Sequence, residues 1–153
     1  MENFENKNHT KLPCINPNNE IKISENTDVH EAIDFILNLF LNKNYETIII
    51  SGLNNAIKKV VLITEIVKSK IPGLHQLNEI NCLKKNINEI NSNDVNFDTN
   101  LNNEKMLPRL SIKLTFIEPS DEEKEKMGYQ KPLNAFEASL INKYKNDIYK
   151  EDE

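Results

Sequence analysis

The residues with the most promising chemistry lie in one short turn, Ser51 to Lys59. A β-branched apolar run, Thr47 to Ile50, leads into this turn, and an apolar helical pattern begins at Ala56. The first backbone N–H groups of such a helix have no partner within the helix, so they attract phosphate. The turn therefore resembles a helix end that can bind an anion.

The side chains of the turn strengthen this interpretation. Asn54 and Asn55 can hydrogen-bond to phosphate, sugar or base edges, and Lys58 and Lys59 add positive charge one helical turn further on. In an alternative interpretation, Asn54 or Asn55 simply caps the helix and Lys58 is solvated. The spacing alone leaves both interpretations open.

Other reactive side chains are few and scattered. The imidazoles and thiols are His9, His30, His75, Cys14 and Cys82, and none has the spacing of metal ligands. On a strand, the odd offset of His75 and Cys82 places them on opposite faces, which disfavours a Cys–His nucleophile. The 3 glycines rule out the glycine-rich nucleotide motifs. We expect no enzyme, no cofactor, no metal and no small-molecule substrate.

The charge of the chain is unevenly distributed. The net charge of the 153 residues is −5, which by itself disfavours a nucleic-acid binder. Residues 117–153 carry ten acidic and six basic side chains, whereas residues 19–116 carry twelve and eleven. The excess of acid is therefore concentrated in the C-terminal region, and the central region is nearly neutral.

Nothing in the sequence indicates a membrane span or a secretory signal. The longest apolar runs, such as Phe35 to Leu41, are far shorter than the roughly 20 residues that a span needs. Residues 1–10 are polar and lack the apolar core of a signal peptide. We therefore expect an intracellular protein, in the nucleus, the cytoplasm or both, with no membrane partner and with reduced cysteines.

The first half of the chain alternates between strand and helix patterns. Glu20 to Ile23 alternates as a short strand, and Thr47 to Ser51 has the uniform apolar pattern of a strand buried on both faces. Between them lies a helix capped by Asp28 and Glu31. Its apolar face comprises Val29, Ala32, Ile33, Ile36, Leu37 and Phe40.

The second half contains another helix and two further strands. The helix ends at Pro72-Gly73, and a weak strand pattern begins at Leu74. Residues Lys84 to Lys105 are Asn-rich, which indicates a long loop or a flexible hairpin arm, and Leu110 to Phe116 alternates as a last strand. The predicted apolar face of the helix comprises Ile57, Val60, Val61, Thr64, Val67 and Ile71.

This order predicts an α/β two-layer sandwich, β-α-β-α-β-β, with two helices on a four-stranded mixed sheet. We expect a flexible N-terminal tail (1–18), a domain (19–118) with an Asn-rich arm at about 84–107, and an acidic C-terminal tail (119–153). The tail contains a possible amphipathic helix, which either packs on its own domain or binds a partner or stays partly disordered. Its apolar positions are Leu133, Phe136, Leu140, Tyr144 and Ile148.

Six short segments follow one another along the chain: 19–23, 49–61, 64–68, 73–76, 109–112 and 128–132. Together they resemble the Alba family of small nucleic-acid-binding proteins. The last three resemble most the eukaryotic branch that includes the larger Alba-type subunit of ribonuclease P and ribonuclease MRP. The resemblance spans roughly residues 19–132, and its fold agrees with the one predicted above.

The resemblance implies RNA or DNA binding without catalysis, by a dimer with a basic surface and two hairpin arms. Lys22, Lys59 and Arg109 match basic positions of the family, and Lys58 supplements them. Ser51 stands where the family usually has a basic residue, and Asn54-Asn55 replaces a Gly-Arg pair. We therefore expect weak binding by the chain alone, and a homodimer or a more basic Alba-type heterodimer partner.

The first hypothesis is a non-catalytic RNA-binding subunit, in a ribonucleoprotein such as ribonuclease P/MRP or in mRNA storage and translational control. The alternatives are a DNA-binding chromatin protein and an interaction scaffold that has lost most nucleic-acid contact. Under the first hypothesis the contacting residues are Lys22, Asn54, Asn55, Lys58, Lys59 and Arg109, supplemented by Lys84, Lys85 and Lys105 on the arm.

Overall fold

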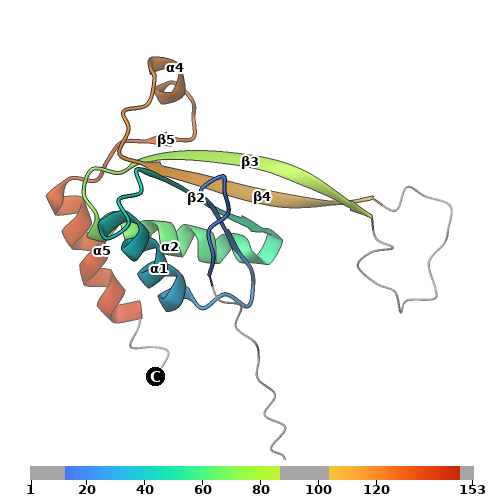
Figure 1. Cartoon of the computed structure of the whole chain (residues 1–153), viewed down its shortest axis with the longest axis horizontal. Coiled ribbons are helices and arrows are strands. Elements are labelled where there is room, and N and C mark those ends of the chain that lie inside the picture. The colour runs from blue at the N-terminus through green and yellow to red at the C-terminus, as the bar shows by residue number, and fades with distance from the viewer. Residues whose placement is uncertain (1–12, 87–103, 149–153) are drawn as a thin grey trace, which may run out of the picture.

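The computed structural model describes residues 13–86 and 104–148, which form a mixed sheet with its three longer helices packed on one face (Figure 1). The predicted α/β two-layer class is confirmed. The elements are β1 (Glu20–Ile23), α1 (Val29–Leu41), β2 (Thr47–Leu53), the 3-10 turn η1 (Asn54–Ala56), α2 (Ile57–Lys70), β3 (His75–Asn86), β4 (Glu104–Thr115), α4 (Asp121–Lys124), β5 (Tyr129–Gln130) and α5 (Ala135–Ile148).

The sheet has five strands in the described residues, in the order β1-β2-β4-β3-β5. Strands β1 and β2 are parallel, and every other neighbouring pair is antiparallel. The sequence predicts four strands and misses β5, because two residues are too few to show an alternating pattern. Strand β5 adds an edge strand next to β3, where Gln130 pairs with Gln76.

Gly128 allows this strand to approach β3 closely. Its carbonyl oxygen accepts a hydrogen bond of 2.8 Å from the Asn78 backbone N–H. A Cβ atom at position 128 would overlap the Asn78 carbonyl oxygen. The connection therefore needs a residue without a side chain.

The core lies between the sheet and helices α1 and α2. Strand β2 is an interior strand between β1 and β4, and its Ile48 and Ile50 are fully buried against the helices. Ile49 on the opposite face is only half-buried, so the predicted burial of both faces is wrong. The buried side of α2 differs from the prediction: Val61 is 44% exposed, and Ile63 and Ile66 are buried instead. Helix α2 packs against α1 and α5 as well as against the sheet, so its buried face is broader than one apolar stripe.

The ends of α1 follow local sequence signals. The Asp28 side chain accepts a 2.9 Å hydrogen bond from the Glu31 N–H, as the predicted cap requires. At the other end Asn42 closes the helix, and Asn44 adopts a positive φ of 57°.

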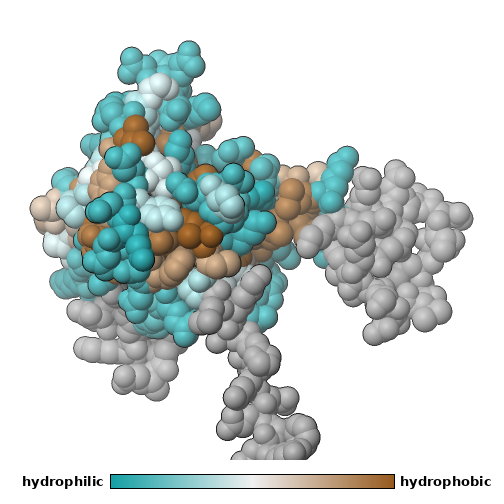
Figure 2. Space-filling model, in the orientation of Figure 1, coloured by the Kyte–Doolittle hydropathy of each residue, from teal (hydrophilic) through white to brown (hydrophobic). Residues whose placement is uncertain are grey.

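The predicted Asn-rich arm is a hairpin over the part that the structure describes. Strands β3 and β4 pair as far as Asn86 and Glu104, so Lys84, Lys85 and Lys105 lie in strands and not in a loop. Residues 87–103 lie outside the described residues. The hairpin projects well beyond the helices (Figure 1). Ile80 and Met106 of the hairpin are exposed, and hydrophobic colour appears along it in Figure 2.

Helix α5 packs on its own chain, which is the first of the alternatives for the C-terminal helix. Asn134 and Glu137 cap it reciprocally, each side chain accepting from the backbone N–H of the other. The Ser69 hydroxyl at the end of α2 donates to the Asn142 side chain at 3.0 Å. Two residues of the predicted apolar stripe do not lie on the packed face of α5: Phe136 is 69% exposed and Leu140 is 38% exposed.

Candidate nucleic-acid interface

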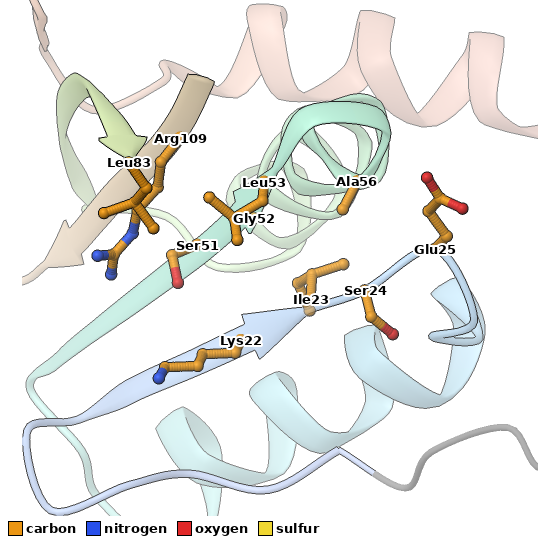
Figure 3. Close-up of a pocket in the computed structure, with 10 residues that line it drawn as sticks. All are labelled: Lys22, Ile23, Ser24, Glu25, Ser51, Gly52, Leu53, Ala56, Leu83 and Arg109. Atoms are coloured by element: carbon orange, nitrogen blue, oxygen red, sulfur yellow. The ribbon is translucent and has the colours of Figure 1, made fainter. Parts of the chain in front are cut away.

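A pocket of about 270 Å³ lies where strands β1 and β2 end (Figure 3). We call it the strand-end pocket. Two predicted site residues, Lys22 and Arg109, belong to its lining, and the turn into α2 forms one side. The residues that line it are Lys22, Ile23, Ser24, Glu25, Ser51, Gly52, Leu53, Ala56, Leu83 and Arg109.

The sheet register brings these residues together. Because β1 and β2 are parallel, both strands end at the same edge, where Lys22 is the register partner of Ser51. Strand β4 runs antiparallel to β2 and places Arg109 opposite Leu53. Residues separated by more than eighty positions in the sequence therefore share one edge of the sheet.

Gly52 allows α2 to sit close to this edge. A Cβ atom at position 52 would lie 2.7 Å from Cγ2 of Val60 and 3.2 Å from Cβ of Ala56. The absence of a side chain lets the first turn of α2 approach β2, so the helix start borders the pocket.

Arg109 is ion-paired within the chain. Its guanidinium donates to the carboxylate of Glu20, and the Ser51 hydroxyl donates to the same carboxylate oxygen at 2.6 Å. Burial alone would raise the pKa of Glu20, but the Ser51 hydrogen bond and the Arg109 charge outweigh it and hold that pKa below its ordinary value. Glu20 is therefore ionised at neutral pH and neutralises Arg109.

Lys59 fixes the loop that follows β1. Its Nζ donates to the backbone carbonyl oxygens of Glu25 and Thr27, at 2.5 and 2.7 Å. The same loop is closed by the Thr27 hydroxyl oxygen, which accepts from the Ser24 N–H at 2.9 Å. Carbonyl oxygens carry no net charge, so the positive charge of Lys59 stays uncompensated while its position is fixed.

Asn54, Asn55 and Lys58 lie on the surface at the start of the helical turn. Asn54 has a positive φ of 50°, which Asn tolerates better than most residues. In the described structure no side-chain hydrogen bond caps η1 or α2 at its N-terminal end. The interpretation in which an Asn54 or Asn55 side chain caps the helix is therefore wrong for this structure. The Asn54 carbonyl oxygen instead accepts from the Ile57 N–H, so η1 leads directly into α2 and the uncapped end is the start of η1.

The lysines of the hairpin stand apart from this group. Lys85 is the register partner of Lys105, and Lys84 is the partner of Met106. Lys84 and Lys105 are exposed. Leu83 lines the strand-end pocket, and the three lysines lie beyond it toward the tip of the hairpin, on residues that follow Leu83 in β3 or precede its partner Leu107 in β4.

Sequence reasoning missed Glu20 as a site residue. It lies at the start of β1, and only its pairing with a residue 89 positions away gives it a role. Ser51 stands out in the sequence only as a departure from a basic family position, but it is buried and holds the Glu20 carboxylate. The available signal was the alternation in β1, which places Glu20 and Lys22 on the same face.

Other chemistry has little basis in the described residues. Residues 13–86 and 104–148 contain no group of three or more His, Cys, Asp or Glu side chains arranged to hold a metal ion. Cys14 and Cys82 are both free and exposed. None of the helices in these ranges is long and apolar enough to cross a membrane.

A family model and a curated relative point to the same family. Residues 19–84 match the family model named Alba. The chain is 39% identical over 75 residues to the DNA/RNA-binding protein ALBA2 of Plasmodium falciparum (isolate 3D7), a match that covers 48% of this chain and 32% of that relative. The chain thus spans about a third of the length of this curated relative. Among solved structures, it is similar to Alba from Thermoplasma volcanium, with 16% identity, a TM-score of 0.48, and coverage of 63% of this chain and 98% of the other.

Proposed function

We propose, from the premise that residues 19–84 match the Alba family model, that the protein is a non-catalytic nucleic-acid-binding subunit whose main ligand is RNA. The observation that carries the proposal is the strand-end pocket beside the start of η1, which no side chain caps, with Lys22, Lys58 and Lys59 around it. The printed name of the Plasmodium relative, a DNA/RNA-binding protein, supports the ligand class.

The charges around the pocket suit a few phosphate contacts. Lys22 and Lys58 are exposed and have no ion-pair partner in the described part of the chain, and Lys59 bonds only to uncharged carbonyl oxygens. The backbone at the start of η1, which no side chain caps, would add N–H donors for the same anion. These groups would contact phosphate or ribose, with Asn54 and Asn55 as further donors and acceptors.

RNA is favoured over duplex DNA because the set of uncompensated cations is small. A protein that compacts a duplex needs many phosphate contacts. Each contact changes the slope of log affinity against log salt concentration by only about one unit or less. With Arg109 neutralised by Glu20, the described residues at this edge offer three uncompensated cations: Lys22, Lys58 and Lys59. A loop or single strand of RNA can bend into the pocket and present its ribose and base edges as well.

The biological setting of the proposal is a ribonucleoprotein, ribonuclease P/MRP-like or engaged in mRNA storage and translational control. A second Alba-type subunit, identical or more basic, would add the cations that this chain lacks. The main alternative is an interaction scaffold with little nucleic-acid contact, favoured by the Glu20–Arg109 pair and the acidic C-terminal region. A DNA-binding chromatin role is the other alternative.

Fluorescence anisotropy of the purified chain against single-stranded RNA, structured RNA and duplex DNA, each across a salt series, tests the proposal. We expect RNA to bind more tightly than the duplex, with a negative salt slope. Lys58→Glu should weaken binding and flatten the slope by about 0.7, because it removes one phosphate interaction with a single strand. The matched control is Lys70→Glu, which reverses the charge of an exposed lysine at the far end of the same helix.

Lys59 is excluded from this test because its contacts with Glu25 and Thr27 also stabilise the loop after β1. Absence of binding at low salt would contradict the proposal and favour the scaffold. Equal losses for Lys58→Glu and Lys70→Glu would show that the strand-end pocket is not the contact surface. Tighter binding to the duplex would favour the chromatin role.

A further inference from the structure

A second pocket, of about 450 Å³, lies on the side of the sheet that α1 and α2 leave uncovered. We call it the sheet-face pocket. Residues 118–128, which include α4, fold over this side and supply one wall (Figure 1). The lining residues are Ile49, Leu77, Asn78, Glu79, Ser111, Lys113, Glu123, Lys126 and Gly128. The volume is within the range of about 300–1,000 Å³ that small-molecule pockets occupy.

The register fixes the floor of this pocket. Lys113 of β4 is the partner of both Ile49 on β2 and Leu77 on β3. The apolar side chains of Ile49 and Leu77 are half-buried and flank the stem of Lys113. The floor is therefore an apolar surface with one cation at its centre.

The charged groups of the pocket are of both signs. Within the described chain the side-chain amines of Lys113 and Lys126 have neither a hydrogen-bond nor an ion-pair partner. Glu79 on β3 and Glu123 on α4 supply two carboxylates. Two acids beside two lysines disfavour a site for phosphate alone, because the carboxylates would repel a chain of phosphates. They suit a ligand that combines an anion with a hydrogen-bond donor.

A single unstacked nucleotide combines these properties. Its base has apolar faces that can lie on Ile49 and Leu77, and its phosphate can bind a lysine. A carboxylate accepts a hydrogen bond from the exocyclic amine of cytosine, whereas uracil presents a carbonyl oxygen at the same position and would be repelled. The pocket therefore distinguishes bases by the presence of that amine.

The sheet-face pocket neighbours the strand-end pocket along β4. Arg109, Ser111 and Lys113 are alternate residues of β4 and share one face, and Ser51 of the strand-end pocket is the register partner of Ser111. Four residues of a strand span about 13 Å. A bound strand can thus extend from one pocket to the other along β4, past the Glu20–Arg109 ion pair that covers Ser51.

We propose that the sheet-face pocket binds one unpaired nucleotide of the bound RNA and prefers a base with an exocyclic amine, as in cytosine, to uracil. The inference rests on the proposed RNA-binding function and extends it. The strand-end pocket binds the backbone, while the sheet-face pocket gives the protein its base preference.

Anisotropy with 12-nucleotide oligo-C and oligo-U, which differ in the group that the carboxylates would face, tests the inference. Wild-type protein should bind oligo-C about tenfold more tightly than oligo-U, the size expected of a good base-edge contact. The double variant Glu79→Ala/Glu123→Ala should bind both oligonucleotides equally. The control Glu122→Ala/Glu125→Ala removes the same charge from exposed residues of the same region and should keep the preference.

A second pair of variants tests the phosphate contact. Lys126→Ala should flatten the salt slope for oligo-C by about 0.7, and Lys131→Ala, an exposed lysine outside the pocket, should not. Circular dichroism of each variant confirms that the fold is kept.

The outcomes separate this inference from the proposed function. RNA binding with equal affinity for oligo-C and oligo-U overturns the base preference and leaves the RNA-binding function intact. If the preference for oligo-C survives in Glu79→Ala/Glu123→Ala, or is lost equally in the control variant, then the base is not recognised in the sheet-face pocket. Absence of binding to any RNA at low salt overturns both.

Discussion

The cations at the strand-end pocket and those around β5 have opposite surroundings. Lys22 in the pocket lining and Lys58 on the adjoining first turn of α2 are exposed without an ion-pair partner in the described residues. Near β5, Lys68 on α2 is 2% exposed and its Nζ donates to Gln76 at 2.6 Å and to Gln130 at 3.2 Å. The same residue type therefore serves two purposes: positive charge is available to an anion at one edge and is used to hold the fold at the other.

The surroundings of β5 continue this pattern of internal contacts. His75 is buried, and its Nδ1 lies 2.9 Å from the Tyr129 hydroxyl while its Nε2 lies 3.3 Å from the Glu118 carboxylate. Lys124 pairs with the other oxygen of Glu118. We therefore expect substitutions near β5 to change stability first and those at the strand-end pocket to change affinity first.

Gly128→Val should produce the largest effect near β5. Its side chain would overlap the Asn78 carbonyl oxygen, so β5 must move or separate from β3. We expect a loss of about 1–3 kcal/mol in the free energy of unfolding, the usual size of an overpacking effect, measured by urea denaturation. Met127→Ala, at the fully exposed neighbouring residue, should change it by less than about 0.5 kcal/mol.

The same variant also tests whether the two regions are independent. In the Gly128→Val background, Lys58→Glu should weaken RNA binding by the same factor as in the wild type, since distant sites usually add. A smaller factor would show that the strand-end pocket depends on β5, and the contrast between the two regions would fail.

Glu20→Gln, at the strand-end pocket, should have an intermediate effect, on RNA affinity. Removing the carboxylate charge frees Arg109 for phosphate, which makes the salt slope more negative by about 0.7 and raises RNA affinity about fivefold at 0.1 M salt. Salt-series anisotropy measures both quantities. Glu46→Gln removes an equal charge from an exposed residue outside the pocket and is the control.

An unchanged affinity in Glu20→Gln would mean that Arg109 does not reach the ligand even when it is unpaired. A gain of equal size in Glu46→Gln would attribute the effect to net charge alone. Because the folded-state pKa of Glu20 is lowered, its contribution to stability is present at neutral pH and is lost as the pH falls through that value.

The elements that the sequence predicts well are those whose signals are local. The cap at Asp28, the β-branched run of β2 and the Pro72-Gly73 stop each depend on a few adjacent residues, and α1, β2 and α2 form where these signals place them. Strand β5 has only two residues and exists because Gly128 lets the chain approach β3. No local pattern carries that information.

The candidate site also has a part that local sequence predicts and a part that depends on distant contacts. Lys22, Lys59 and Arg109 follow from the family resemblance, and Asn54, Asn55 and Lys58 follow from the helix start. The pairing of Arg109 with Glu20 and the role of Lys59 in the β1–α1 loop depend on contacts 89 and about 30 residues apart. These contacts are set by the strand order, so the sequence locates the site but does not tell which of its cations are compensated.

Lys68 should give the smallest effect, visible only in the pH dependence of stability. Burial lowers its pKa below the ordinary 10.5, against the opposing charges of Glu65 and Glu137. Between the lowered folded-state pKa and 10.5 the unfolded chain binds more protons than the folded one, so stability rises with pH in that window. Lys68→Met should remove this rise, whereas Lys70→Met, at the exposed neighbour, should keep it. Urea denaturation of the three proteins from about pH 7 to about pH 10 measures the difference. Parallel profiles for wild type and Lys68→Met would show that the buried amine carries the same charge in the folded and unfolded chain. The lysines of the two regions would then differ in where they lie and not in their protonation.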